Sequence, residues 1–212
     1  MSTDMEQYYE ERAPVYDRVY AYEERQEDLR TLEQKVQQYF AGKHVLEVAA
    51  GTGYWSQFIC RTATGLLATD VNPGPLQVLQ ERKLEKPVDT LVADGYTLEE
   101  VKETFEAGFA GCWISHIPIA ERTAWFERFH AKLEIGSKVL LLDNSEAQTV
   151  RLPIIDRDDD GNTYQERVTD AGDAYRVVKN FPDAEELKVL VDDPHAVFTM
   201  MDHYWSFEYT VV

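Results

Sequence analysis

Apolar residues between positions 29 and 40 recur with helical spacing. They are separated by steps of three and four residues, which places them on one face of an α-helix. These residues are Leu29, Leu32, Val36, Tyr39 and Phe40. Gly42 follows them, and glycine is frequent just beyond a helix C-terminus. The pattern therefore predicts a helix with one buried face that ends before residue 42.

From residue 44 onward, short apolar runs alternate with amphipathic segments. The apolar runs predict strands at residues 44–48, 66–69, 88–92, 108–114 and 138–142. The segments between them predict helices at residues 54–61, 75–83 and 119–133. Strands that alternate with helices favour a parallel sheet covered by helices on both faces.

The C-terminal part of the chain departs from this alternation. Residues 145–180 combine polar turns with β-type stretches, and a helix is predicted at 183–191. The last apolar runs, 196–200 and 204–212, are close enough to pair as an antiparallel hairpin at a sheet edge. We therefore predict an α/β fold: a Rossmann-like, doubly wound, mostly parallel seven-stranded sheet with an antiparallel terminal edge strand.

The composition fits one globular domain spanning residues 1–212. Hydrophobic residues make up 44% and charged residues 28% of the chain, as in ordinary globular proteins. No apolar run approaches the roughly 18 residues that cross a bilayer, and the N-terminus lacks the basic-then-apolar order of a signal peptide. Cys60 and Cys112 have neither metal-ligand nor disulfide spacing. We expect a cytoplasmic protein without a membrane partner.

The chain is strongly acidic. It has 21 Lys and Arg residues against 39 Asp and Glu residues, which gives a net charge of −18. Such a field repels a polyanionic backbone, because nucleic-acid affinity comes largely from cationic contacts to phosphates. We therefore expect a small-molecule substrate and no nucleic-acid partner.

The first predicted strand leads directly into a glycine-rich turn at residues 49–53, and a predicted helix follows. Glycine allows a sharp turn and a close approach of ligand to backbone. The start of the following helix offers unpaired N–H groups and a partial positive charge. The pattern predicts a binding site that takes either a pyrophosphate or a carboxylate.

Two nucleotide-binding motifs are not matched. The dinucleotide fingerprint needs a third glycine, which is absent after Gly51 and Gly53, and no Gly-Lys-Ser/Thr phosphate loop is present. Tyr175 and Lys179 have the Tyr-x-x-x-Lys spacing of short-chain dehydrogenases, but the residues around them are typical of a strand. A nicotinamide-dependent oxidoreductase is therefore a disfavoured alternative.

Residues 45–53 resemble the first motif of class I S-adenosylmethionine-dependent methyltransferases, an acidic residue followed by spaced glycines. Ala49 stands where many members carry the first glycine, and alanine suits this turn if its φ stays negative. Asp70, at the end of the second predicted strand, matches the family's ribose-binding acid. Asp94 matches the acid near the third strand that meets the adenine amino group. The resemblance covers roughly residues 8–143.

This resemblance implies S-adenosyl-L-methionine as the cofactor. Glu47 and the Gly51–Gly53 backbone would bind its methionine end, Asp70 its ribose, and Asp94 its adenine. The residues expected at the cofactor are Tyr16, Glu47, Ala49, Gly51, Gly53, Trp55, Asp70, Val71, Asp94, Gly95, Tyr96 and Trp113. The alternatives are that the three acids are solvated strand-end carboxylates and that Trp113 only fills the core.

The tyrosine-rich N-terminal segment resembles the small-molecule branch that includes quinone C-methyltransferases, in which this segment lies over the cofactor. Residues 1–43 are therefore expected to form a helical lid, with Tyr9 and Arg12 near the substrate. His116 is the candidate general base, since imidazole titrates near 6.5, and it is also expected at the substrate. The alternative is that these tyrosines and His116 only pack or cap helices.

The segment at residues 145–180 follows the fifth predicted strand. We expect it to cover the site or to form a homodimer interface. Its acidic run at 156–162 resembles the start of an EF-hand loop, but Arg167 stands where the last ligand should be glutamate. A solvated acidic turn is therefore favoured, and no metal site is predicted.

Taken together, these patterns predict methyl transfer from S-adenosylmethionine to a small-molecule acceptor by in-line displacement. A non-catalytic cofactor-binding or scaffold protein is the second hypothesis, and a nicotinamide-dependent oxidoreductase is the third. The acceptor and its methylated atom are not identified by the sequence.

Overall fold

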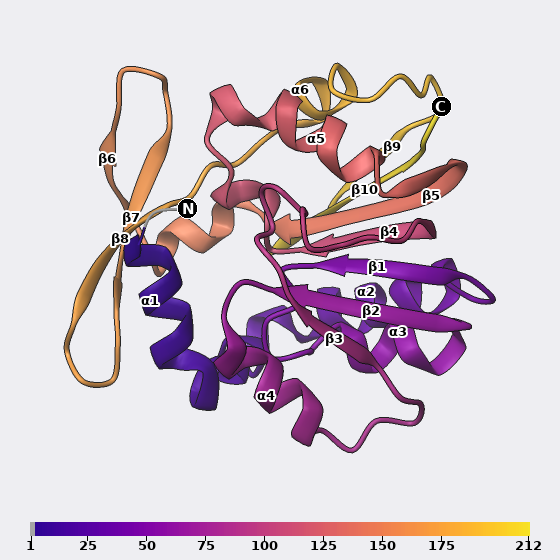
Figure 1. The fold of residues 1–212 in the computed structure, drawn as a ribbon. Coiled ribbons are helices and arrows are strands. Elements are labelled where there is room, and N and C mark those ends of the chain that lie inside the picture. Colours follow the sequence, from indigo (N-terminus) through magenta and orange to yellow (C-terminus); the bar gives the residue numbers. More distant parts are fainter. Residues whose placement is uncertain (1–2) are drawn as a thin grey trace.

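A seven-stranded sheet forms the centre of the computed structural model, which describes residues 3–212 (Figure 1). Its strands follow the order β3-β2-β1-β4-β5-β10-β9. They are β1 (His44–Val48), β2 (Gly65–Asp70), β3 (Asp89–Val92), β4 (Phe105–Gly111), β5 (Leu133–Asn144), β9 (Val197–Met200) and β10 (Tyr204–Thr210). Strands β1 to β5 pair in parallel, whereas β10 runs antiparallel to both β5 and β9. The predicted fold class is confirmed.

The terminal hairpin differs in one detail from the prediction. The last strand, β10, lies between β5 and β9, so that β9 forms the sheet edge. The burial of side chains explains this order: Trp205, Phe207 and Tyr209 of β10 are all buried, whereas Val197 and Met200 of β9 are exposed. Tyr204 and Ser206, on the other face of β10, are buried as well, so the strand with both faces covered takes the inner position.

Helices cover both faces of the sheet (Figure 1). The helices packed on the sheet are α2 (Gln26–Tyr39), α3 (Ser56–Thr62), α4 (Pro73–Glu81), α5 (Arg122–His130) and α6 (Ala184–Lys188). Successive residues of β5 point to opposite faces of the sheet. Leu140 and Leu142 pack in the core cluster that contains residues of α2 and α3. Val139 and Leu141 pack in the cluster that contains residues of α5. Such burial on both faces is typical of parallel strands. It explains the continuous apolar run at 138–142.

The predicted N-terminal helix corresponds to α2, and Gly42 follows it with a φ of +73°. The tyrosine-rich segment before α2 forms three short helices, which are α1 (Thr3–Arg12), η1 (Ala13–Tyr20) and η2 (Glu23–Arg25). Helix α1 contacts both α4 and the strand β8 described next. The segment therefore bridges two distant parts of the chain.

Residues between β5 and α6 form a separate three-stranded antiparallel sheet (orange in Figure 1). Its strands are β6 (Ile154–Arg157), β7 (Thr163–Val168) and β8 (Ala174–Val178), preceded by η5 (Glu146–Val150). The Tyr175 hydroxyl donates to Glu11 of α1 over 2.8 Å. Tyr175 lies on a strand, which confirms that the Tyr-x-x-x-Lys spacing here is not helical.

Two remaining short helices are η3 (Ile114–His116) and η4 (Ile119–Glu121). The acidic run at 156–162 forms the turn between β6 and β7, where Asp158 accepts hydrogen bonds from Asn162 and Tyr164. Among residues 3–212, no group of three acidic, His or Cys side chains is arranged to hold a metal ion.

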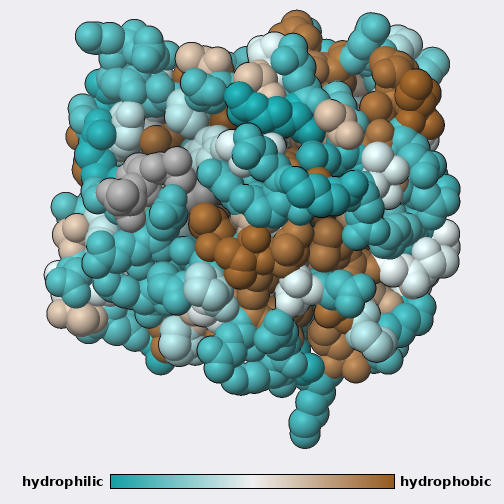
Figure 2. Space-filling model, viewed as in Figure 1, coloured by the Kyte–Doolittle hydropathy of each residue, from teal (hydrophilic) through white to brown (hydrophobic). Residues whose placement is uncertain are grey.

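The surface in Figure 2 is mostly hydrophilic, with a band of hydrophobic residues across the middle of the face. This polar surface agrees with the mean hydropathy of −0.43 and the net charge of −18. Within the part of the chain that the structure describes, no helix has the length and apolar content to cross a membrane.

Candidate active site

A cavity of about 780 Å³ lies at the carboxyl ends of β1, β2 and β4. From β1 the chain passes through α3 to β2 and through α4 to β3, on one side of β1 in the sheet. It then returns to β4, on the other side of β1, and continues through α5 to β5. Ligands of open α/β sheets bind where the strand order reverses in this way.

Most of the residues expected at the cofactor line this cavity. They are Tyr16, Ala49, Gly51, Trp55, Asp70, Val71, Gly95 and Trp113, and the expected substrate residues Tyr9 and His116 line it as well. Glu47, Gly53, Asp94 and Tyr96 do not. Asp94 and Tyr96 lie instead along a neighbouring pocket that also contains His116.

The turn after β1 requires a left-handed backbone at three positions. Ala49, Gly51 and Gly53 have φ values of +54°, +56° and +78°. The expectation that Ala49 keeps a negative φ is therefore wrong, and this alanine carries roughly 1–2 kcal/mol of backbone strain. A Cβ at Gly53 would also overlap Leu79 of α4. The turn holds the backbone close to the cavity at the expense of local strain.

Asp70 ties the end of β2 to this turn. Its Oδ2 accepts from the Gly51 N–H and its Oδ1 from the Asn72 N–H, both over 2.9 Å. Burial raises the pKa of Asp70 to about 6, against the opposing effect of these hydrogen bonds. Each carboxylate oxygen has a further lone pair, so Asp70 can still accept two hydroxyl groups from the cavity.

Glu47 lies beneath the turn rather than in the cavity wall. It is buried, and its Oε2 accepts from the Ser56 hydroxyl over 2.6 Å. Burial raises the pKa of Glu47 to about 8, so the side chain is mostly protonated at neutral pH. Its contact with the ammonium of a bound cofactor stays a prediction.

Two buried donors in the cavity wall have no hydrogen-bond partner among residues 3–212. The indole Nε1 atoms of Trp55 and Trp113 make no hydrogen bond, although buried polar groups normally have one. Together with the free lone pairs of Asp70, they supply donors and acceptors for a polar ligand. A ligand with an adenine base, ribose hydroxyls and an amino-acid end fits this set.

A second cavity of about 980 Å³ adjoins the first. The two share Tyr9, Tyr16, Tyr20, Cys112 and His116, which therefore form the boundary between them. The second cavity is covered by the N-terminal helices and by the three-stranded sheet.

Arg12 lines this second cavity, and so do basic residues that were not expected at the site. They are Arg25, Arg151, Arg167 and Lys179. No local pattern marks Arg25 or Arg167, since each enters the cavity from a segment far away in the sequence. Lys179 was noted only for its spacing from Tyr175.

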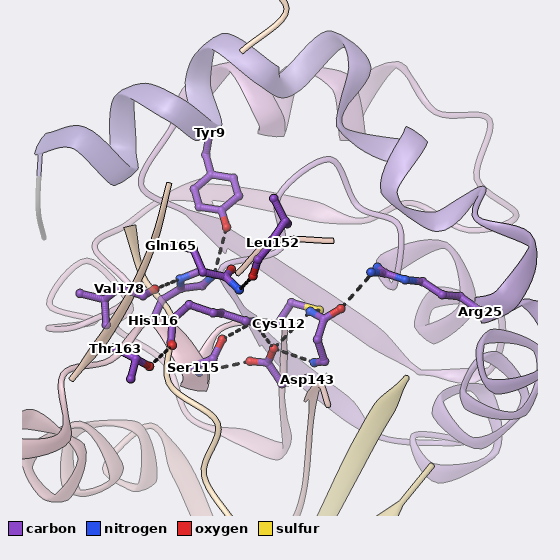
Figure 3. Close-up of polar contacts among 12 residues, drawn as sticks. Tyr9, Arg25, Cys112, Ser115, His116, Asp143, Leu152, Thr163, Gln165 and Val178 are labelled. Atoms are coloured by element: carbon purple, nitrogen blue, oxygen red, sulfur yellow. Dashed lines mark hydrogen bonds and ion pairs between the residues drawn. The ribbon is translucent and has the colours of Figure 1, made fainter. Parts of the chain in front are cut away.

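His116 holds the hydroxyl of Tyr9 at this boundary, as Figure 3 shows. Its Nδ1 lies 2.6 Å from the Val178 carbonyl oxygen. Because a carbonyl can only accept, Nδ1 carries the proton, and Nε2 accepts from the Tyr9 hydroxyl over 2.9 Å. Burial and the nearby Lys179 charge hold the pKa of His116 well below its usual value. The imidazole is therefore neutral, and its basic nitrogen is already engaged.

A buried ion pair lies below His116. Lys179 Nζ is 2.7 Å from Asp143 Oδ1 and donates to the Ser115 hydroxyl over 2.7 Å. The Lys179 and Asp143 side chains are 1% and 0% exposed. The pair joins the end of β5, the η3 helix and the end of β8, so it fixes the three-stranded sheet against the site.

Residues 45–136 match the family model described as a methyltransferase domain. The motif residues that suggested this family therefore lie within the matched range. Residues 45–136 therefore carry a methyltransferase domain. Its cofactor is S-adenosylmethionine. No curated protein matches the sequence.

Solved structures with the same fold support the methyltransferase architecture. A structure described as the DhpI-SAM-HEP complex has a TM-score of 0.79 at 20% identity, covering 97% of this chain and 95% of that chain. The PH0226 protein from Pyrococcus horikoshii OT3 has a TM-score of 0.70 at 16% identity, with 90% and 93% covered. The N-methyltransferase NodS from Bradyrhizobium japonicum WM9 has a TM-score of 0.62 at 10% identity, with 89% and 97% covered. At these identities the likeness is one of fold.

Proposed function

We propose that this methyltransferase transfers the methyl group of S-adenosylmethionine to a small-molecule acceptor by in-line displacement. The observation that carries the proposal is the pair of adjoining cavities that meet at Tyr9, Tyr16 and His116. One cavity has the polar groups for the donor, and the other leaves room for an acceptor on the far side of the boundary. Structures similar in fold include a glycopeptide N-methyltransferase, and this likeness is consistent with a small acceptor.

Asp70 is the main donor-binding residue in this proposal. Its two free lone pairs accept the ribose hydroxyls in charge-assisted hydrogen bonds. The rings of Tyr9 and Tyr16, whose centroids are 5.6 Å apart, line the cavity. Aromatic faces attract a sulfonium cation and exclude water. Asp94, Gly95 and the neighbouring backbone then meet the adenine, as the family resemblance implies.

The reaction needs an acceptor lone pair aligned with the methyl–sulfur bond. When bound, S-adenosylmethionine would supply its methyl group to this lone pair, and S-adenosylhomocysteine would be the second product. The bound sulfonium supplies an already activated methyl group. The protein therefore contributes orientation and a dry site. Tyr9, held by His116, lies where the two reactants meet, and its role is to position the acceptor.

Two covering segments exclude water in this proposal. The described part of the expected N-terminal lid, residues 3–43, covers the donor, and the sheet within 145–180 caps the acceptor side. The Tyr175–Glu11 and Arg18–Asp170 contacts join the two covers. A homodimer through the cap and a cytoplasmic location stay predictions from the sequence. So does the quinone C-methyltransferase branch, which rests on the lid alone.

Calorimetric titration with S-adenosylmethionine tests the donor site. We expect binding to the wild-type protein and a dissociation constant about tenfold or more higher for Asp70→Asn, which loses charge-assisted hydrogen bonds. Asp89→Asn is the matched control, because Asp89 is exposed at the start of the neighbouring strand β3. Equal affinity of both variants, or no binding by the wild type, would contradict the assignment.

A second measurement separates the enzyme from a non-catalytic binder. The protein is incubated with S-adenosylmethionine and a metabolite extract, and mass spectrometry follows metabolites that gain a methyl group. Donor binding without any methylated product would favour the scaffold alternative. Binding of NAD(P) in place of the methyl donor would favour the oxidoreductase.

A further inference from the structure

We infer that the acceptor carries an anionic group, either a carboxylate or a phosphate. Arg12, Arg25 and Arg167 bind this group in the second cavity. This inference rests on the proposed function, because it names the acceptor class for the same site. It follows from the charge and the pairing of the side chains that line the cavity.

All charged side chains that line the second cavity among residues 3–212 are basic. They are Arg12, Arg25, Arg151, Arg167 and Lys179. The chain has nearly twice as many acidic residues as basic ones, 39 against 21, so an average surface would show more carboxylates than cations. A purely cationic lining in a protein of net charge −18 indicates an anionic ligand.

Two of these five cations are already paired. Lys179 is paired with Asp143, and Arg151 lies 2.7 Å from Glu24. In the described part of the chain, Arg12, Arg25 and Arg167 have no carboxylate within ion-pair distance.

The three unpaired arginines are also short of hydrogen bonds. Their Nε atoms are buried and have no hydrogen-bond partner among the residues that the structure describes. Arg25 and Arg167 are only 6% and 9% exposed. Burying a cation without a counter-charge is costly, so a cavity that gathers three of them is built for an anion that arrives with the ligand.

The contacts of Arg25 and Arg12 leave their guanidinium groups available. Arg25 reaches the Val19 carbonyl and the Asn144 side-chain oxygen only over 3.5 Å each. Arg12 donates to the Tyr8 hydroxyl over 2.9 Å and makes no other side-chain hydrogen bond within the described residues. A guanidinium binds carboxylate or phosphate oxygens through two parallel N–H groups.

The arginines lie next to the place where the methyl group is transferred. Arg12, Arg25 and Arg167 line the same cavity as Tyr9 and His116, which belong to the boundary of the two cavities. An oxyanion bound by these arginines would therefore anchor the acceptor within reach of the donor. Tyr9, Tyr16 and Tyr20 at the boundary would then contact the rest of the acceptor and fix its orientation.

The test uses the full chain saturated with S-adenosylhomocysteine and inorganic phosphate or acetate as the probe, in separate titrations. Thermal unfolding and calorimetry follow binding, with sodium chloride at equal ionic strength as the salt control. We compare the wild type with Arg167→Gln and Arg25→Gln. Arg176→Gln is the matched control, because Arg176 lies on the same small sheet, pairs with Asp156 and does not line the cavity.

We expect at least one probe to bind the wild type and Arg176→Gln equally, and about tenfold more weakly to either cavity variant. We also expect Arg167→Gln to raise the melting temperature of the anion-free protein, because it removes an unpaired buried charge. A residue with only a structural role would lower that temperature. The probe that binds distinguishes the phosphate from the carboxylate class.

The inference is overturned if S-adenosylhomocysteine binds normally while neither probe binds the wild type, or if both cavity variants bind the probes as the wild type does. Failure of S-adenosylhomocysteine to bind would instead overturn the proposed function. The two failures are therefore distinguishable in the same set of titrations.

Discussion

Breaking the Lys179–Asp143 pair should destabilise the protein far more than breaking an exposed ion pair. Lys179→Met leaves the Asp143 carboxylate buried, 0% exposed, with its main counter-charge removed. Removing one partner of a buried pair typically costs about 3–5 kcal/mol. Because a domain has only about 5–15 kcal/mol of net stability, this single change removes a large part of it.

Urea unfolding at neutral pH measures the effect. With a slope of about 2–3 kcal/mol per molar urea for a chain of this size, we expect the midpoint to fall by roughly 1–2 M. Arg176→Met is the matched control, since Arg176 and Asp156 are 46% and 52% exposed and such pairs contribute about 1 kcal/mol or less. Replacing both partners, as Lys179→Met with Asp143→Leu, should recover much of the loss, because no buried charge is left.

The reasoning would be refuted if Lys179→Met and Arg176→Met shifted the midpoint equally. It would also be refuted if the double variant lost the sum of the two single losses, because coupled partners in contact are not additive. Either result would mean that water reaches the pair or that Asp143 finds another counter-charge.

Three other predictions concern the donor cavity and its boundary. In thermal unfolding, Gly53→Ala should destabilise the protein by about 1–3 kcal/mol more than Gly42→Ala does. Both glycines have a positive φ, but only the new Cβ at residue 53 would overlap Leu79. Equal losses of stability would contradict the packing argument. The affinity for S-adenosylmethionine should rise between pH 5.5 and 7.5. Burial raises the pKa of Asp70 to about 6, and only the ionised carboxylate accepts both ribose hydroxyls. In calorimetry, Asp70→Asn should bind the donor with an affinity that does not change over this pH range. The His116 ring should show the Nδ1–H form by nitrogen NMR with no titration between pH 5.5 and 8, because burial and Lys179 lower its pKa; a titration near 6.5 would instead support a general base.

The sequence predicted those elements whose pattern is local. The three- and four-residue apolar spacing identified α2, and the short apolar runs identified β1 to β5, because side-chain periodicity reflects which face of an element is buried. The glycine turn and Asp70 were also readable, since both come directly after a strand, and the carboxyl ends of parallel strands meet at one edge of the sheet.

Other features depended on packing that no local pattern encodes. The inner position of β10 follows from competition between two apolar strands for a buried place, and the positive φ of Ala49 follows from the path that the turn must take to the cavity. The start of β5 at Leu133, five residues before the predicted run, reflects pairing with β4 rather than apolar content.

By itself, the sequence determined the α/β architecture, the donor motif and the absence of a dinucleotide fingerprint, since each depends on residues near one another in the chain. Only the tertiary structure decided how charge is distributed inside an acidic protein. Arg12 and Arg167 are 155 positions apart in the chain, and these two residues and Arg25 converge because the N-terminal helices and the small sheet fold over the same edge of the central sheet. Net charge adds over the whole chain, whereas a ligand responds to the few charges that the fold places around it.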